Sequence, residues 1–402
     1  MAGLEAIVRH RVSVQTVQEW ARANSSRYIK AGRSAKKQIV DEFAATSGLN
    51  RRYLQSLLRR APAVRSGPIR RPRARRYGDD VRRALERVWK ASDRVCARRL
   101  VPFLQELVPR LERSGHLMIE PLTRQKLLAI SVATADRLLS SVRQREGARQ
   151  RSCTRPGALL KHQILVRTFA DWDDDRPGFL EADLVAHCGD YGGGEFIHTL
   201  TLTDVRTQWT ECVALPNRGQ LTTVEAVDAV RKRLPFPILG IDSDNGAELI
   251  NAHLLRYCRS RSITFTRSRP AKKNDQCRVE QKNGQIVRRY VGYNRHESCD
   301  ELAALACLYR ALRHWQNYFQ PSMKLISKER NGARVTRRYD RAQTPYQRLI
   351  ASGILDDDDR EQLIEYYQQL DPVAALQAVE YAQTQLHRAA KDRFSSEATG
   401  DI

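Results

Sequence analysis

The sequence predicts an α/β domain, a mixed sheet with helices on both faces, preceded by an all-α basic region and followed by a helical C-terminal hairpin. Three observations lead to this fold class. The chain has 402 residues, enough for two to four domains. Its apolar residues follow a helical period to about residue 144 and alternate as in strands from residue 179. Positive charge is concentrated before residue 169.

The charge is divided unevenly between the two parts of the chain. Residues 1–168 contain 37 Lys and Arg against 13 Asp and Glu, a net charge of +24, whereas residues 169–402 contain 32 against 33, a net charge of −1. Such a surplus favours a polyanion, because each neutralised phosphate releases counterions. We therefore expect double-stranded DNA as a partner of the first part. A solvated basic surface is the alternative.

Composition excludes several other classes. Hydrophobic residues make up 41% of the chain, which is enough to build packed cores. No apolar run reaches the roughly 20 residues that span a bilayer, and the first residues lack the apolar stretch of a signal peptide. We expect a cytoplasmic protein with no membrane partner. The eight cysteines show no CxxC or paired Cys/His spacing, so we expect reduced thiols rather than a zinc site.

The first predicted domain, residues 1–60, ends in a helix-turn-helix. One helix carries Ile39, Val40 and Phe43 on a single face, and a second begins after Asn50, a good N-cap. The second helix has an apolar side of leucines, and a recognition helix presents cations to DNA in the same way. Its candidate DNA-binding residues are Arg51, Arg52, Arg59 and Arg60. An ordinary helical hairpin with a glycine turn has the same pattern.

An arginine-rich linker, residues 61–78, follows. Between Arg51 and Arg76 there are ten arginines and no acidic residue, and the second half of the stretch contains three prolines. We expect this linker to follow DNA phosphates. Its candidate contacts are Arg71, Arg73, Arg75 and Arg76.

A second helical region, residues 79–168, is also predicted to bind DNA. Its candidate core residues recur at helical spacing, and Ser131 is placed to cap a helix that contains Ala135, Leu138 and Leu139. A second helix-turn-helix unit next to a basic linker strengthens the case for DNA binding.

The mixed sheet is predicted within residues 169–320. In the stretch 179–188, Leu180, Ala182 and Leu184 face one side, and Glu181, Asp183 and His187 face the other. Further strands are expected at 196–205, 209–215, 237–241 and 263–266, with helices at 224–234 and 247–258. Three hairpin strands followed by alternating helix and strand give a mixed five-stranded sheet.

Three carboxylates carry the predicted chemistry. Asp183 lies in the middle of a strand, Asp244 follows the strand LGID, and Glu280 lies in a helical segment among basic residues. Three acidic oxygen ligands suit Mg²⁺ or Mn²⁺, and two such ions activate a water or a 3′-hydroxyl for attack on a phosphodiester. Taken singly, the three residues also fit an edge strand, an ordinary turn and a solvated helix.

The order and spacing of this triplet, with 35 residues between Asp244 and Glu280, resemble the DDE insertion-sequence transposases and retroviral integrases. The resemblance covers about residues 175–320, includes HWQNYF and PSMKL, and implies a ribonuclease-H-like catalytic core. It implies that Asp183, Asp244 and Glu280 form a catalytic triad binding two Mg²⁺ or Mn²⁺ ions. It also implies a transposase that binds element-end DNA, cleaves it and transfers the new strand to target DNA, as a homo-oligomer on DNA.

Three points depart from the pattern of this family or complicate it. Many integrases have Lys or Arg seven residues after the glutamate, where this chain has Val287, with Arg288 and Arg289 next. Asp242 is a rival second ligand, although the 35-residue interval favours Asp244. The zinc-binding domain of retroviral integrases has no counterpart in the first part of the chain.

Further expectations concern the surroundings of the site and the end of the chain. Lys272 and Lys273 lie in a loop expected over the site, and together with Lys282, Arg288 and Arg289 they are candidate DNA contacts; a solvated loop is the alternative for the two lysines. A small segment spans residues 321–353, and a helical hairpin spans 354–402. Two other functions stay open: a nuclease or resolvase without strand transfer, and a DNA-binding transcriptional regulator with an inert domain. The intact acidic triplet argues against the regulator.

Overall fold

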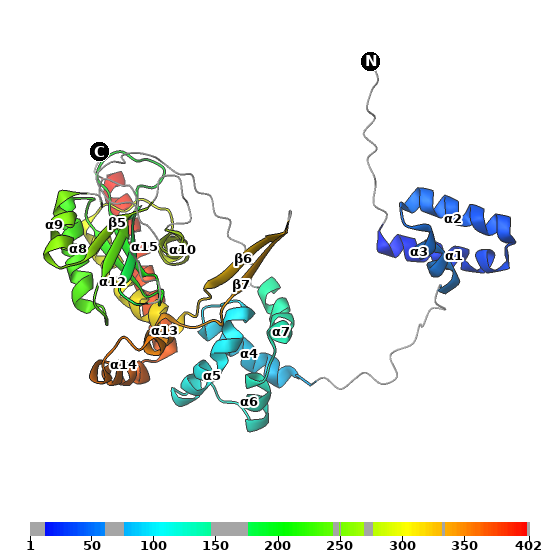
Figure 1. Ribbon diagram of the computed structural model, residues 1–402, viewed down its shortest axis with the longest axis horizontal. Coiled ribbons are helices and arrows are strands. Elements are labelled where there is room, and N and C mark those ends of the chain that lie inside the picture. Colours follow the sequence, from blue (N-terminus) through cyan, green and yellow to red (C-terminus); the bar gives the residue numbers. More distant parts are fainter. Residues whose placement is uncertain are drawn as a thin grey trace, which may run out of the picture. The chain divides into compact units, whose positions relative to one another are not determined.

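The computed structural model divides the chain into two compact units, with the boundary between Arg76 and Tyr77 (Figure 1). In the part of the chain that the structure describes, no helix is both long and apolar enough to cross a membrane. The described residues are 13–60, 76–145, 176–243, 249, 251–268, 276–331 and 334–399.

The first unit contains three helices, α1 (Val14–Lys30), α2 (Arg33–Ser47) and α3 (Arg51–Arg60). Gly48 ends α2 with a left-handed φ of 67°, and the Asn50 side chain accepts a 2.8 Å hydrogen bond from the Arg52 backbone N–H at the start of α3. These signals produce the predicted pair of helices joined by a short turn. Their role in DNA binding stays a prediction.

One small core holds the three helices together. Leu54 and Leu58 of α3 are fully buried, and the arginines lie on the remaining faces of the helix. The buried members of this core are Val17, Ala21, Tyr28, Ile39, Val40, Phe43, Leu54 and Leu58.

The second unit begins with four helices, α4 (Asp79–Ala91), α5 (Ala97–Arg113), α6 (Pro121–Leu128) and α7 (Val132–Arg145). Ser131 caps α7 as predicted, because its hydroxyl accepts from the Thr134 backbone N–H at 3.3 Å. Apolar residues at helical spacing form the core of this region and are buried: Trp89, Leu100, Phe103, Leu104, Leu107 and Leu111.

A mixed five-stranded sheet is the centre of the second unit, as predicted. Its order is β3-β2-β1-β4-β5; β1, β2 and β3 are antiparallel neighbours, and β1, β4 and β5 are parallel. This arrangement is consistent with a ribonuclease-H-like core. The strands are β1 (Phe179–Ala186), β2 (His198–Asp204), β3 (Thr210–Leu215), β4 (Gly240–Ser243) and β5 (Thr264–Arg267).

Helices cover both faces of the sheet (Figure 1). Two of them, α8 (Gln220–Arg233) and α9 (Ala252–Ser260), connect the strands from β3 to β5. Both differ from prediction in their bounds: α8 begins four residues earlier than expected, and α9 begins only after Asn251, whose side chain caps it. The opposite face carries α10 (Cys277–Lys282), the π-helix η1 (Asn283–Val287), α11 (Arg288–Tyr290), α12 (Cys299–His314) and the π-helix η2 (Trp315–Phe319).

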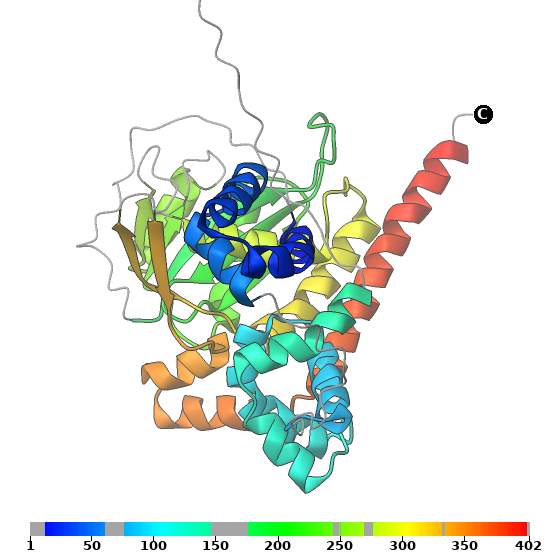
Figure 2. The ribbon, with the colours of Figure 1, turned by 90° about the vertical axis from the view of Figure 1, so that its right-hand side faces the viewer.

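The C-terminal region is helical, as predicted, but it begins with a hairpin that the sequence did not predict. Strands β6 (Leu325–Asn331) and β7 (Arg334–Tyr339) form a separate two-stranded sheet. Three helices follow: α13 (Pro345–Ser352), α14 (Asp357–Gln369) and α15 (Pro372–Thr399). Figure 2 shows α15 running alongside α12, with which it packs.

The four helices of residues 79–145 share one hydrophobic core with the sheet and the C-terminal helices. Polar contacts reinforce this packing. Asp93, in the turn between α4 and α5, accepts hydrogen bonds from Arg289 at 2.8 Å and from the Tyr290 hydroxyl at 2.6 Å. The segment that contains Glu280 is therefore attached to this helical region through α11.

Candidate active site

One face of the central sheet is acidic. Strand alternation places Glu181 and Asp183 of β1 on the same face, and the parallel register pairs Glu181 with Asp242 of β4. Glu181 and Asp242 are fully buried, whereas Asp183 is partly exposed. We call Glu181, Asp183 and Asp242 the acidic face.

Two hydrogen bonds position Asp183. Its Oδ1 accepts from the Leu184 backbone N–H at 2.8 Å, and its Oδ2 accepts from the Asn283 side-chain amide at 2.6 Å. Asn283 is the first residue of η1, and it is 8% exposed. Each carboxylate oxygen can accept more than one partner, so these contacts orient Asp183 without using all of its lone pairs.

Glu181 attaches α10 to the sheet. Its Oε2 accepts from the backbone N–H groups of Arg278 and Val279, both at 3.0 Å, and its Oε1 accepts from the Arg278 guanidinium at 2.9 Å. These contacts neutralise a carboxylate that is completely buried. They also fix the first turn of α10 against β1.

The same helix carries Glu280. Glu280 lies three residues, about one turn, before Asn283, so the two side chains are on the same face of the helix. Glu280 is exposed, and the Asn283 amide contacts Asp183. Two separate contacts, at Glu181 and at Asp183, therefore hold the segment with Glu280 against β1. The fold therefore brings the strand that carries Asp183 next to the helix that carries Glu280.

The end of β4 adjoins this site. Ser243, its last residue, pairs with Ala182, the residue before Asp183. Asp244 follows Ser243 in the sequence and lies outside the described residues, as do Lys272 and Lys273. The rival acid Asp242 is fully buried and accepts a 2.6 Å hydrogen bond from the Thr266 hydroxyl.

The described carboxylates suit a hard cation in their chemistry, because oxygen ligands are preferred by Mg²⁺ and Mn²⁺. Among the residues that the structure describes, no group of three His, Cys, Asp or Glu side chains has the geometry of a metal site. The predicted triad includes Asp244, which is not one of those residues.

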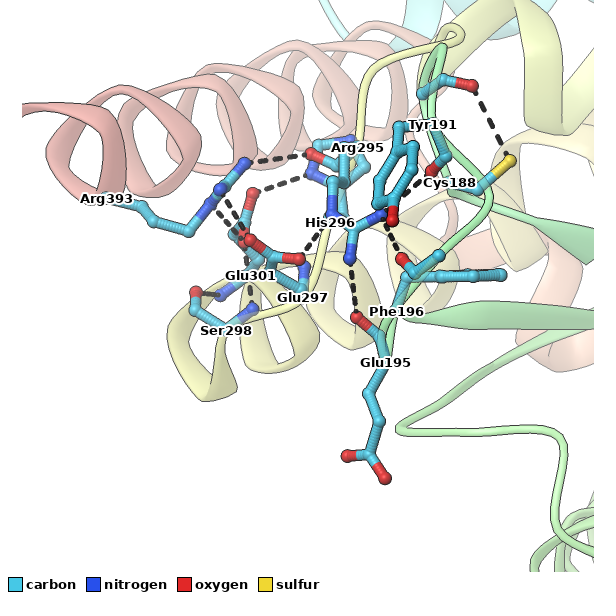
Figure 3. Close-up of polar contacts among 12 residues, drawn as sticks. Cys188, Tyr191, Glu195, Phe196, Arg295, His296, Glu297, Ser298, Glu301 and Arg393 are labelled. Atoms are coloured by element: carbon cyan, nitrogen blue, oxygen red, sulfur yellow. Dashed lines mark hydrogen bonds and ion pairs between the residues drawn. The ribbon is translucent and has the colours of Figure 1, made fainter. Parts of the chain in front are cut away.

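Arg295 organises the glycine-rich loop that follows β1 (Figure 3). Its guanidinium donates to the carbonyls of Tyr191, Gly193 and Glu195, each at 3.0 Å. A glycine is required at position 189, because its φ is 62° and an added Cβ would approach the Arg295 Cβ to 3.0 Å. The loop at the carboxyl end of β1 is therefore held in one shape.

A buried ion-pair group, formed by Glu301, His296 and Arg393, lies next to Arg295 (Figure 3). Glu301 is fully buried; its Oε1 lies 2.9 Å from His296 Nδ1, and its Oε2 lies 3.2 Å from Arg393 Nε of α15. Burial opposes its ionisation, but hydrogen bonds from His296 and from the backbone N–H groups of Glu297 and Ser298 lower the pKa of Glu301 to about 2. The group is a structural connection between the loop and α15.

The predicted DNA contacts in α3 are all exposed. Arg51, Arg52, Arg59 and Arg60 are open to solvent, and Arg51 also forms an ion pair with Asp41 of α2. In the linker, Arg76 is exposed, and Arg71, Arg73 and Arg75 lie outside the described residues.

Three predicted contacts near the site are used within the protein. Lys282 is only 4% exposed, so it belongs to the interior, and burial together with the charges of Arg99 and Arg348 lowers its pKa to about 8. This burial corrects the prediction that Lys282 faces DNA. Arg288 donates to the Ala186 carbonyl at 3.4 Å, and Arg289 pairs with Asp93.

Sequence reasoning missed two functional candidates, Glu181 and Asn283. Glu181 shares the face of Asp183 by alternation, and Asn283 is three residues after Glu280. Both signals were present in the sequence. The sequence did not indicate which helix would cover that face of β1.

The fold and site define an α/β protein with an acidic site where a helix is attached to the central strand. No family model matches the chain. The chain is 44% identical over 329 residues to the uncharacterized protein y4rM of Sinorhizobium fredii, over 82% of this chain and 93% of that protein. It therefore belongs to the family of y4rM. Among solved structures, it is similar to the catalytic core domain of BIV integrase, with 18% identity and a TM-score of 0.30, over 44% of this chain and 95% of that one.

Proposed function

We propose that the chain is a DDE-type transposase or integrase, which binds element-end DNA, cleaves it and joins the new 3′-hydroxyl to target DNA. One observation carries this proposal: Asn283 contacts Asp183, and Glu181 fixes the helix that bears Glu280. Two acids separated by 96 intervening residues thus belong to one strand–helix pair. A carboxylate pair on one strand–helix pair at the face of the sheet suits phosphodiester chemistry.

The residues proposed to hold two Mg²⁺ or Mn²⁺ ions are Asp183, Asp244 and Glu280. Bound there, the ions would polarise the phosphodiester and stabilise charge on the attacking and leaving oxygens. The protein's own groups prepare the site: Asn283 orients the Asp183 carboxylate, and Glu181 sets the position of α10. Full burial of Asp242 and its bond to Thr266 favour a structural role for that rival acid.

The proposed DNA partner is supported by charge. The net charge of +24 in residues 1–168 suits phosphate binding, and α3 exposes four arginines while Leu54 and Leu58 are buried in the core. We propose that α3 contacts base edges and that the arginine-rich linker contacts phosphates.

The test uses the full-length protein and a duplex that contains the DNA flanking its coding region. Asp183→Asn and Glu280→Gln are expected to abolish cleavage and strand transfer in Mg²⁺ or Mn²⁺, while DNA binding stays nearly unchanged. Glu225→Gln, an exposed change on α8, is the matched control and should retain activity. Full activity of the Asp183→Asn protein would contradict the proposal.

The two alternatives predict different products. Cleavage without a joined product would favour the nuclease or resolvase. Sequence-specific binding without any cleavage by the unaltered protein would favour the transcriptional regulator.

A further inference from the structure

The β6–β7 hairpin is an isolated ribbon on the second unit. Its two strands pair antiparallel from Leu325 with Tyr339 to Asn331 with Arg334, and neither pairs with another strand in the described residues. Figure 1 shows the ribbon projecting from the body of the unit. A two-stranded ribbon without a covering layer gains little stability from its own packing, so it needs another reason to be retained.

The ribbon is strongly basic. Residues 325–339 contain five Lys or Arg residues and one Glu. Three of the five, Arg334, Arg337 and Arg338, belong to β7. A polyanion lying along the ribbon would be attracted by this charge.

The arginines of β7 are open to solvent. Arg337 and Arg338 are both exposed, and in the described part of the chain neither forms an ion pair. By contrast, Arg233 and Arg313 elsewhere in the same unit are both paired with the buried Glu211. The ribbon therefore presents cations that the fold itself does not neutralise.

The base of the ribbon is rigidly held. Asp340 accepts from the Lys324 backbone N–H and from Arg348, both at 2.6 Å, so it closes the two strand ends together. The Lys324 ammonium donates to the Arg206 carbonyl at 3.0 Å. Through these contacts the ribbon keeps a defined direction relative to the sheet.

The ribbon begins close to the helix that bears Glu280. Lys324 donates to the carbonyl of Arg206, two residues beyond the end of β2, and α10 packs against β2. Burial lowers the pKa of Lys324, and the charge of Arg278 on α10 lowers it further. A partner that lies along the ribbon can therefore extend from the neighbourhood of α10.

We propose that the β6–β7 ribbon binds the phosphate backbone of double-stranded DNA, independently of sequence, and directs that DNA toward the candidate active site. Its charge selects a polyanion, and the major groove of a duplex admits a two-stranded ribbon. The part of this inference that concerns the active site rests on the proposed function. DNA binding by the ribbon does not.

The experiment measures binding of the full-length protein to a random duplex by fluorescence anisotropy at several salt concentrations. The double variant Arg337→Ala, Arg338→Ala should flatten the slope of log K against log salt by about 2, since each phosphate contact contributes about 0.9. Between 50 and 200 mM salt, the unaltered protein should then lose about tenfold more affinity than the variant.

Three comparisons make the result decisive. Arg256→Ala with Arg259→Ala, two exposed arginines of α9, is the matched control and should leave the slope unchanged. Arg337→Lys with Arg338→Lys retains the charge and should retain the slope. Arg337→Gln with Arg338→Gln should repeat the loss with polar side chains, and thermal melting checks that each variant is folded.

An unchanged slope in the alanine and glutamine variants would overturn the proposal, and so would an equal loss in the α9 control. If the ribbon bound a protein instead of DNA, the salt slope would stay unchanged in these variants. The Asp183→Asn protein separates the two proposals, because it tests cleavage without altering the ribbon. Loss of slope in a protein that never cleaves DNA would leave the ribbon proposal standing and the proposed function refuted.

Discussion

The acidic face of the sheet and helix α3 of the first unit hold charge in opposite ways. Glu181 is fully buried and receives three hydrogen bonds from Arg278 and Val279, whereas Arg52 and Arg59 extend into solvent from a helix anchored by buried leucines. A buried carboxylate persists only where the fold supplies its partners, so its position is fixed. An exposed cation keeps its freedom and is screened by salt. Changes on the acidic face should therefore alter chemistry and stability, and changes on α3 should alter DNA binding alone.

The largest effect is expected from the second acid of the proposed triad. Asp244→Asn should reduce cleavage on the order of a thousandfold, because it removes a proposed metal ligand. Asp242→Asn should stay within about tenfold of full activity, since an amide oxygen can still accept from Thr266. Cleavage assays on both folded variants check this contrast. An active Asp244→Asn protein beside an inactive, folded Asp242→Asn protein would reverse the assignment.

Glu181→Gln tests whether the attachment of α10 is important for stability. The change weakens the bonds to Arg278 and removes the buried negative charge, which should cost about 3 kcal/mol in the free energy of unfolding. Urea denaturation measures the loss, and Glu225→Gln is the exposed control, expected within about 0.5 kcal/mol of the unaltered protein. Cleavage should fall as well, because α10 carries Glu280. Unchanged stability would mean that other contacts hold α10.

Acid should destabilise the same side of the sheet through His187. Burial, followed by the nearby His296, lowers the pKa of His187 to about 3 from the usual 6.5. Between these values the unfolded chain binds a proton that the folded protein does not, so stability falls as the pH drops below 6.5. From pH 6.5 to 4.5 the loss from this one group is about 2 to 3 kcal/mol.

The measurement is unfolding free energy against pH for the unaltered protein and for His187→Gln. The variant should be less stable at neutral pH, since it alters the contact with Thr199, but its stability should decline less steeply between pH 6.5 and 4.5. Parallel curves would show that His187 does not titrate differently in the folded and unfolded states.

The sequence was a good guide where one period governed a whole element. Alternation predicted β1 and the shared face of Glu181 and Asp183, and Asn50 and Gly48 marked the turn before α3. It was a poor guide where partners are distant in the chain. Nothing local indicates that Glu181 receives the N–H groups of Arg278 and Val279, or that residues 79–145 share a core with the sheet.

Two further misses have different causes, one local and one long-range. The β6–β7 ribbon was not predicted because charged residues occupy six of its thirteen strand positions, so neither strand alternates regularly between apolar and polar residues. Lys282 was predicted to face DNA because of its charge alone. Its burial follows from the packing of α10 against β1 and β2, which is a long-range effect.

The smallest effect is expected from the exposed arginines of α3. Arg51 and Arg52 are both exposed in the first turn of α3, but the Arg51 guanidinium is paired with Asp41, whereas the Arg52 backbone N–H donates to Asn50. Arg52→Ala should weaken binding to element-end DNA by about 1 to 2 kcal/mol and leave random DNA nearly unaffected, because only base contacts distinguish sequences. Arg51→Ala should weaken it less, since its guanidinium already has a partner.

The linker arginines are the comparison for Arg52, because they are proposed to contact phosphates rather than base edges. Replacing Arg71 and Arg73 should weaken binding to both DNAs alike and flatten the salt slope by about 1 for each phosphate that is no longer neutralised. Anisotropy titrations on end and random duplexes measure all of these variants, with Arg388→Ala on α15 as an exposed control. An equal loss on both duplexes from Arg52→Ala would make α3 a phosphate-binding helix, and sequence recognition would then pass to α7, which begins after Ser131.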